Sequence, residues 1–254
     1  MSKTTNITSA RATFLRERAL ALFLDVDGTL LELAATPDRV RVPAALRNTL
    51  QLARQREHGA LALLSGRSLA ELDELFAPCR FVASGKHGLE VRLPSGEIVR
   101  PDVDQAALDR ARQWLGLLAK ENRGLLFEDK GAALAMHFRL APRMAPEVHS
   151  VMTELADELG EDFVLRPGKS VLEIMPRGFS ERSAIELLMQ QREFAGRTPV
   201  FVGDDPTDEV GFEAVNEMGG HTIRVGDLTE TAARFRFSNP ATVVAWLRDR
   251  NLNR

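Results

Sequence analysis

The sequence predicts an α/β fold in which a doubly wound parallel sheet carries an inserted α+β cap domain. In the ranges 19–101 and 176–254, short apolar runs alternate with longer helical patterns, which is typical of a parallel sheet covered by helices on both faces. The range 102–175 reads as helix, strand and strand, repeated twice, which indicates an antiparallel sheet with helices on one face. Turn residues at 93–96 and 175–178 mark the two borders.

The elements of the core follow from this alternation. Buried strands are expected at 20–25, 60–64, 80–83 and 199–203, with a short later strand at 223–225. Helices are expected between them, at 43–57, 68–75, 181–192 and 207–218. His58 and Gly59 end the first helix, because glycine adopts the left-handed conformation that stops a helix.

The cap is expected to contain two helices and four strands. The helices cover 104–120 and 146–159, and the strands cover 125–128, 132–139, 163–165 and 171–174. Residues 1–18 read as an N-terminal tail, frayed or short-helical, without the apolar run that a secretory signal needs.

Composition excludes several classes of function. The chain has 254 residues, 44% of them apolar, and a net charge of −3, so nothing in its charge favours nucleic acid or an anionic membrane as a partner. The single cysteine, Cys79, excludes an internal disulfide and a cysteine-rich zinc site. No run approaches the roughly 18 apolar residues of a membrane span. We therefore expect a soluble, cytoplasmic protein with a small-molecule partner.

Two carboxylates leave the first strand together. Asp25 and Asp27 end an apolar run, and side chains at i and i+2 leave a strand on the same face. Gly28 follows and allows the backbone to turn sharply toward a ligand. Such a pair can hold a divalent cation, with one carboxylate free to attack and the other to move protons. The alternative, a solvated polar exit from the strand, leaves the following Gly-Thr-Leu unexplained.

Two further polar segments follow expected strands. Ser65 offers a hydroxyl, and Gly66 allows backbone N–H groups to face an anion, so this turn can cradle a phosphate. Three acids follow the strand at 199–203, namely Asp204, Asp205 and Asp208. Acids also suit a helix start, but three together would repel one another without a cation. Ligands bind beyond the carboxyl ends of parallel strands, so these segments can meet at one place.

These segments resemble the motifs of a known superfamily. Residues 21–30 are similar to the first motif of the haloacid dehalogenase (HAD-like) superfamily, 65–67 to its second and 200–209 to its fourth. Within that superfamily the chain resembles the trehalose-6-phosphate phosphatases from about residue 19 to its C-terminus. Six stretches carry this resemblance: 84–90, 128–132, 137–139, 168–174, 176–178 and 196–205.

The resemblance implies a HAD-like, Rossmann-type core and a magnesium-dependent phosphatase. Asp25 would be the nucleophile that forms an aspartyl-phosphate, and Asp27 would be the general acid and base. Magnesium would be held by Asp25, the backbone carbonyl of Asp27 and Asp204, with Asp208 as a further candidate ligand. Ser65 would be a further catalytic residue. The core residues expected to contact the substrate are Thr29, Gly66, Arg67, Lys86, His87 and Gly88, and a structural role is the alternative for His87.

Charged residues of the cap are candidates for sugar recognition. Sugar hydroxyls both donate and accept hydrogen bonds, so carboxylates alternating with cations can bind them. Glu128 and Lys130 flank a turn before a strand, and Arg139 ends that strand. Lys169 and Glu173 stand four residues apart on the returning strand and therefore on one face. A solvated charged face is the alternative, and the resemblance favours trehalose recognition by Glu128, Lys130 and Glu173.

One position departs from the family pattern. Members of the family place a lysine at the start of the helix after Pro-x-Gly, and this chain has Glu181 there. Either Glu181 turns to solvent behind Ser180 as N-cap, and Arg182 reaches into the site instead, or Glu181 points inward and weakens the activity. Arg182 lies about 100° further around the helix and is broader than lysine. The catalytic set expected here includes Arg182.

The function implied by the resemblance is hydrolysis of trehalose 6-phosphate to trehalose and inorganic phosphate, the final step of trehalose biosynthesis. One alternative is a phosphatase of another sugar phosphate, because the cap sets the choice of leaving group. Another is a weakly active or silent regulatory protein that binds a sugar phosphate, which Glu181 favours. An association with a trehalose-phosphate synthase is a further expectation.

Overall fold

A computed structural model describes residues 5–6, 19–33, 40–227 and 230–252. The chain divides into two compact units, one formed by Met1–Val99 with Ser180–Arg254 and the other by Arg100–Phe179. The inserted unit thus begins at Arg100, where the sequence suggested residue 102, and ends at Phe179, where the sequence suggested residue 175. The predicted fold class is confirmed, because the first unit has a mostly parallel sheet and the second a small antiparallel sheet.

The sheet of the first unit is centred on β2 (Leu20–Asp25). On one side follow β3 (Leu61–Leu64) and β4 (Val82–Gly85), and on the other β11 (Thr198–Gly203), β12 (His221–Val225), β13 (Phe235–Phe237) and β1 (Thr5–Asn6), all parallel. Two antiparallel strands, β5 (Glu90–Arg92) and β6 (Ile98–Val99), extend the β4 edge. Residues 5 and 6 therefore form a strand where a frayed or helical tail was expected, and the rest of 1–18 lies outside the described residues.

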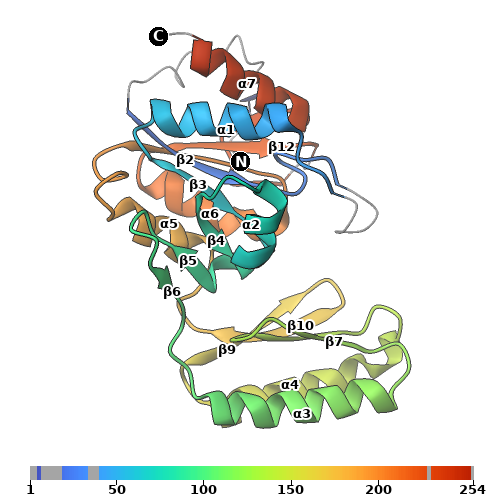
Figure 1. The fold of residues 1–254 in the computed structure, drawn as a ribbon. Coiled ribbons are helices and arrows are strands. Elements are labelled where there is room, and N and C mark those ends of the chain that lie inside the picture. The colour runs from blue at the N-terminus through green and yellow to red at the C-terminus, as the bar shows by residue number, and fades with distance from the viewer. Residues whose placement is uncertain (1–4, 7–18, 34–39, 228–229, 253–254) are drawn as a thin grey trace. The chain divides into compact units, whose positions relative to one another are not determined.

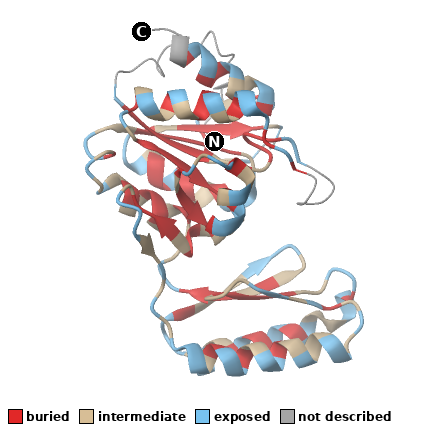
Figure 2. Cartoon of the chain, viewed as in Figure 1, coloured by how far each residue is buried: buried red, intermediate tan, exposed pale blue. Residues whose placement is uncertain are grey.

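Helices cover both faces of this sheet (Figure 1). Along β2, Leu20, Leu22 and Leu24 pack with α1 (Ala44–Arg56), α2 (Leu69–Phe76) and α7 (Pro240–Leu252). The alternate residues Ala21 and Phe23 pack with α5 (Glu181–Met189) and α6 (Glu209–Glu217). Figure 2 shows these central strands as buried. Because side chains alternate along a strand, two apolar faces bury β2 completely and bring Asp25 to the edge of the sheet.

The carboxyl ends of four parallel strands lie side by side at this edge. Asp25 pairs in register with Leu64, the residue before Ser65, and Leu24 pairs with Val202. Short 3₁₀ turns follow two of the strands, namely η4 (Lys86–Gly88) after β4 and η6 (Pro206–Asp208) after β11. The expected meeting of the three motif segments at one edge of the sheet is therefore confirmed for the backbone.

The second unit is a four-stranded antiparallel sheet with two helices on one face (Figure 1). Its strands run in the order β7 (Leu126–Asp129), β8 (Leu134–His137), β10 (Val171–Pro176) and β9 (Phe163–Gly168). Helices α3 (Gln105–Glu121) and α4 (Ala145–Leu159), the latter preceded by η5 (Pro142–Met144), cover the apolar face. None of the described helices is long and apolar enough to cross a membrane.

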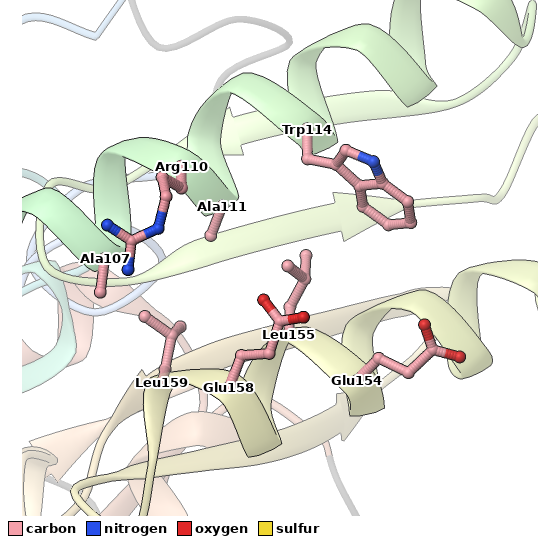
Figure 3. A pocket seen from close by; sticks show the side chains of 8 residues that line it. All are labelled: Ala107, Arg110, Ala111, Trp114, Glu154, Leu155, Glu158 and Leu159. Carbon is pink, nitrogen blue, oxygen red and sulfur yellow. The ribbon is translucent and has the colours of Figure 1, made fainter.

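A hollow of about 310 Å³ lies between α3 and α4 (Figure 3). Trp114 and Arg110 of α3 line one side, and Leu155 and Glu158 of α4 line the other. None of the residues that the sequence marks as site candidates lines this hollow. It is a feature of the second unit alone.

Candidate active site

Three carboxylates meet at the carboxyl edge of the first unit's sheet. Asp25 ends β2, Asp204 follows β11 and Asp208 ends η6. One oxygen from each of them lies within 4.8 Å of the others. Asp25 Oδ2 is buried and has no hydrogen-bond partner among the described residues. Burying a carboxylate oxygen without a partner costs free energy. We therefore expect Asp25 Oδ2 to bind a group that takes oxygen ligands.

The electrostatics of the cluster point to a cation. Burial raises the pKa of Asp25 well above its ordinary value, and the charges of Asp208 and Asp204 raise it further. Burial also raises the pKa of Asp204, and it raises the pKa of Asp208 to about 8, with added repulsion from Glu181 and Asp204. All three acids can be ionised together only if positive charge compensates them. An all-oxygen set of this kind fits a hard divalent metal ion such as Mg²⁺.

Two glycines allow the carboxylates to approach the backbone. Gly28 has φ +85°, and a Cβ atom at this position would overlap the carboxylate of Asp204. A Cβ atom on Gly203 would likewise overlap the carboxylate of Asp208. Thr29, an expected substrate contact, is fully buried, and its Oγ1 donates to Asp204 Oδ1 at 3.4 Å. The structure therefore places Thr29 as a support for the acidic cluster.

Asp27 is held by an arginine. Arg67 Nε donates to Asp27 Oδ2 at 2.6 Å and Arg67 Nη2 donates to Oδ1 at 2.8 Å, a two-point pair that fixes the plane of the carboxylate. Sequence reasoning gave Arg67 a substrate contact and missed this pair. The Asp27 side chain is not among the three that cluster, and metal ligation through its backbone carbonyl stays a prediction.

The expected phosphate turn is joined to η4 by hydrogen bonds. Lys86 N donates to Arg67 O at 2.9 Å, and His87 N donates to Ser65 O at 3.2 Å. Lys86 and His87 have φ values of 50° and 55°, in the left-handed region that side chains rarely adopt. The structure therefore brings Ser65, Arg67, Lys86 and His87 together.

Neighbouring contacts fix this turn further. Gly88 has φ +100° and packs so closely on the backbone of Ser180 that a Cβ would overlap it. Ser65 Oγ accepts from Arg67 N at 3.2 Å, and Lys86 Nζ lies 3.5 Å from Glu90 Oε1.

Glu181 does not face solvent. The residue begins α5 and is only 3% exposed, so the alternative in which Glu181 turns to solvent as a first-turn acid is wrong. Ser180 is the N-cap, as expected, and accepts from Ser183 N. Glu181 Oε1 lies 2.7 Å from His87 Nδ1, and Glu181 Oε2 is buried without a hydrogen-bond partner in the described part of the chain. The inward alternative is the one that the structure supports.

Arg182 points to a different group of residues. Its guanidinium donates to both oxygens of Glu217 at 2.6 and 3.0 Å and lies within 3.8 Å of carboxylates of Glu186 and Glu213. These partners are largely exposed. The structure does not bring Arg182 to the acidic cluster, so its catalytic role stays a prediction that no contact supports.

We expect Arg182→Ala to change turnover by less than about threefold, because the ion pairs of Arg182 are exposed and its guanidinium contacts none of the clustered carboxylates. Steady-state release of inorganic phosphate by the variant and by the unaltered chain measures the effect. A loss of roughly 10²-fold, the scale of a removed charge-stabilising group, would return Arg182 to the catalytic set.

The open face of the second sheet carries a charged row. Ala135 of β8 lies directly opposite Glu128 of β7 on one side and opposite Glu173 of β10 on the other. Glu173 in turn lies opposite Arg166 of β9, so all four residues share one face of the sheet. Lys130 Nζ donates to Glu173 Oε1 at 2.9 Å, and His137 Nε2 lies 2.9 Å from Glu128 Oε2. The structure brings together the three cap residues favoured by the sequence. Arg166 and His137 were missed, although the alternation along their strands could have indicated them.

Two cap predictions need correction. Strand β8 ends at His137, so Arg139 lies in the following turn, exposed, and does not end the strand. Strand β9 continues to Gly168, so Lys169 lies in the exposed turn between β9 and β10. Its four-residue spacing from Glu173 therefore does not place both side chains on one strand face.

Comparison with known proteins gives a consistent result. The family model described as trehalose-phosphatase matches residues 23–240. A probable trehalose-phosphate phosphatase of Sinorhizobium fredii is 42% identical over 206 residues, covering 81% of this chain and 77% of the relative. The trehalose-6-phosphate phosphatase of Escherichia coli is 40% identical over 227 residues, covering 89% and 85%.

Solved structures agree at the level of the fold. The C-terminal domain of a trehalose-6-phosphate phosphatase from C. albicans superposes with a TM-score of 0.78 at 20% identity, covering 98% of each chain. A haloacid dehalogenase-like hydrolase from B. subtilis superposes with a TM-score of 0.64 at 15% identity, covering 90% of this chain and 98% of its own. The HAD-like fold expected from the motifs is thereby confirmed.

Proposed function

Because the chain belongs to the trehalose-phosphatase family of enzymes, we propose that it hydrolyses trehalose 6-phosphate to trehalose and inorganic phosphate, the final step of trehalose biosynthesis. The observation that carries the proposal is the unpartnered Asp25 oxygen inside a cluster of three carboxylates, at the sheet edge where this fold binds ligands. The proposal is tested by phosphate release from a panel of sugar phosphates, with and without added Mg²⁺.

Asp25 is the proposed nucleophile. One of its oxygens attacks phosphorus, the bond from phosphorus to the sugar oxygen breaks, and an aspartyl-phosphate forms. Asp27 gives a proton to the departing sugar oxygen. Water then attacks the aspartyl-phosphate, Asp27 takes a proton from it, and inorganic phosphate leaves with Asp25 restored.

Arg67 sets the geometry of Asp27. Its two hydrogen bonds orient the Asp27 carboxylate in the absence of substrate. A phosphate ester offers the guanidinium a competing set of oxygens, so substrate binding can draw Arg67 from Asp27 toward the phosphate. In this proposal Arg67 orients Asp27 before the substrate binds and contacts the phosphate afterwards.

Mg²⁺ is the proposed cofactor. Asp25, Asp204 and the backbone carbonyl of Asp27 would hold it, with Asp208 close enough to ligate or to support Asp204. When bound, it neutralises the carboxylates and the phosphate oxygens so that one anion can attack another.

The open face of the second unit's sheet is proposed to bind the sugar. We expect Glu173→Ala, Lys130→Ala and Glu128→Ala to reduce kcat/KM for trehalose 6-phosphate by roughly 10-fold or more, because each removes a hydrogen-bonding group from the charged row. Turnover of a small aryl phosphate, which has no second sugar, is expected to stay within about twofold of the unaltered chain. Parallel kinetics on the two substrates measure the difference.

Two controls accompany this experiment. Glu154→Ala removes an exposed carboxylate of the helical side of the same unit and should affect neither substrate. Equal losses on both substrates for the charged-row variants would make these residues structural. Rapid turnover of another sugar phosphate, but not of trehalose 6-phosphate, would favour the first alternative function, and absence of turnover with retained sugar-phosphate binding would favour the regulatory one. Cytoplasmic location and association with a trehalose-phosphate synthase stay predictions.

A further inference from the structure

We propose that Glu181 and His87 form a functional dyad in which buried Glu181 orients His87 and keeps its imidazole cationic, so that His87 Nε2–H binds the phosphate of the substrate. His87 is then a catalytic residue, and Glu181 is a positioning residue that acts through it. The inference rests on the proposed phosphatase function, because it assigns the positive charge that such a site needs.

The first step concerns the burial of Glu181. The residue is 3% exposed, and its Oε1 lies 2.7 Å from His87 Nδ1. A buried carboxylate is stable in its charged form only beside a donor or a positive charge. The imidazole is that partner, and an adjacent carboxylate in turn favours the protonated ring.

The second step concerns the direction of the ring. The two nitrogens of an imidazole lie on opposite sides, and Nδ1 is bound to Glu181. A Cβ atom built on Gly66 would lie 2.6 Å from His87 Nε2, so this nitrogen lies directly against the Ser65–Arg67 turn. Because Gly66 has no side chain, the ring and the backbone of the turn can both face a bound anion.

The third step concerns the backbone that carries the ring. His87 has a left-handed φ of 55° and is tied to the turn by its N–H bond to Ser65 O at 3.2 Å. A non-glycine residue in this region costs free energy, so the surrounding contacts must hold it there. The result is a ring fixed between α5 and the turn instead of a mobile surface histidine.

Charge explains why Glu181 is needed. A neutral imidazole whose Nδ1–H points to Glu181 would present a lone pair at Nε2, and this lone pair would repel phosphate oxygens. The protonated ring presents an N–H donor and a positive charge, which forms a strong hydrogen bond with an anion. Glu181 and His87 together thus place a cation at the phosphate, although the helix itself begins with an acid.

The competing interpretation is that Glu181 only adds negative charge. It repels the carboxylate of Asp208 and would then weaken catalysis. That interpretation predicts that Glu181→Gln and Glu181→Ala raise turnover, whereas the dyad predicts that both lower it. The sign of the effect separates the two.

Kinetics with Mg²⁺ on trehalose 6-phosphate and on an aryl phosphate test the dyad. We expect Glu181→Gln to lower kcat about 10-fold or more and His87→Gln to lower it by about 10–10²-fold.

The double variant should be no slower than His87→Gln alone, because the effects of residues that act as one unit are not additive. Introducing Glu181→Lys into His87→Gln should recover part of the loss by restoring a cation. His149→Gln, an exposed histidine of α4, is the matched control.

A second measurement does not depend on turnover. The chain has five histidines, so comparison with His87→Gln identifies the ring ¹⁵N signals of His87 in an NMR spectrum. We expect both ring nitrogens to be protonated at neutral pH, and inorganic phosphate to shift the Nε2 signal in the unaltered chain but not in Glu181→Gln.

The possible outcomes are distinguishable. A neutral His87 ring, or turnover by Glu181→Gln equal to or above that of the unaltered chain, would overturn the dyad while leaving the phosphatase intact. If neither phosphate ester is hydrolysed but inorganic phosphate still shifts the His87 signal, the proposed function fails and the dyad stands as an anion site.

Discussion

Asp25→Asn is expected to lower phosphate release by about 10⁴-fold or more, because the amide is neither a nucleophile nor an anionic metal ligand. The change is nearly isosteric, so the fold should persist. Release of inorganic phosphate from trehalose 6-phosphate and from an aryl phosphate measures the loss, which should be equally severe for both substrates because in the proposed mechanism every turnover passes through this residue.

The same variant should be at least as stable as the unaltered chain when no divalent cation is present. Burial and two neighbouring acids raise the pKa of Asp25 well above its ordinary value, so its ionised form destabilises the metal-free fold at neutral pH. The neutral amide removes that cost, and each 1 kcal/mol gained raises Tm by about 2–4 °C in a chain of this size. Asp102→Asn, at an exposed carboxylate, is the control and should change neither property. Turnover near the unaltered rate would contradict the nucleophile assignment, and a large fall in metal-free Tm would contradict the inference that ionised Asp25 destabilises the metal-free fold.

The parts of this site that sequence predicts are those set by the strands. The residues before Asp25 alternate between two apolar clusters, which identifies a strand buried on both faces. Because parallel strands end at one edge of the sheet, the sequence alone predicts that Asp25, Ser65 and Asp204 lie near one another. The order of elements in the inserted unit was also predictable, because its apolar residues repeat with clear strand and helix periods.

Side-chain pairs across long separations could not be predicted. Glu181 and His87 are 94 residues apart, and Arg67 and Asp27 are 40 apart, and both pairs depend on loop conformations that no periodic pattern encodes. Lys169 was misplaced because β9 runs through Pro167 to Gly168 before the chain turns. Helix α7 was missed because its apolar residues fall in one continuous run, 243–247, which periodicity alone does not assign to a helix, although Val243, Trp246 and Leu247 are buried in the core.

Removal of divalent cations should abolish turnover and reverse the pH dependence of stability. Asp208 has a pKa of about 8 in the folded chain against an ordinary value of 3.8. Between these values the folded state holds a proton that the unfolded state has lost, so the folded state binds more protons. The free energy of unfolding therefore falls as pH rises through this window, by up to roughly 1.4 kcal/mol per pH unit for each such group. Above about pH 8 this contribution stops changing.

With Mg²⁺ present the trend should weaken or reverse, because the metal binds only the deprotonated carboxylates and stabilises the folded state that holds them. Thermal unfolding at pH 5 and pH 8, with chelator or with Mg²⁺, measures both effects. The chelated protein should have its lower Tm at pH 8, and the rise in Tm caused by Mg²⁺ should be larger at pH 8 than at pH 5. Asp208→Asn should weaken the pH dependence of the chelated protein without removing it, since the amide cannot ionise but Asp25 and Asp204 still can. A Mg²⁺-induced rise that is equal at both pH values would mean that these buried acids do not hold the metal.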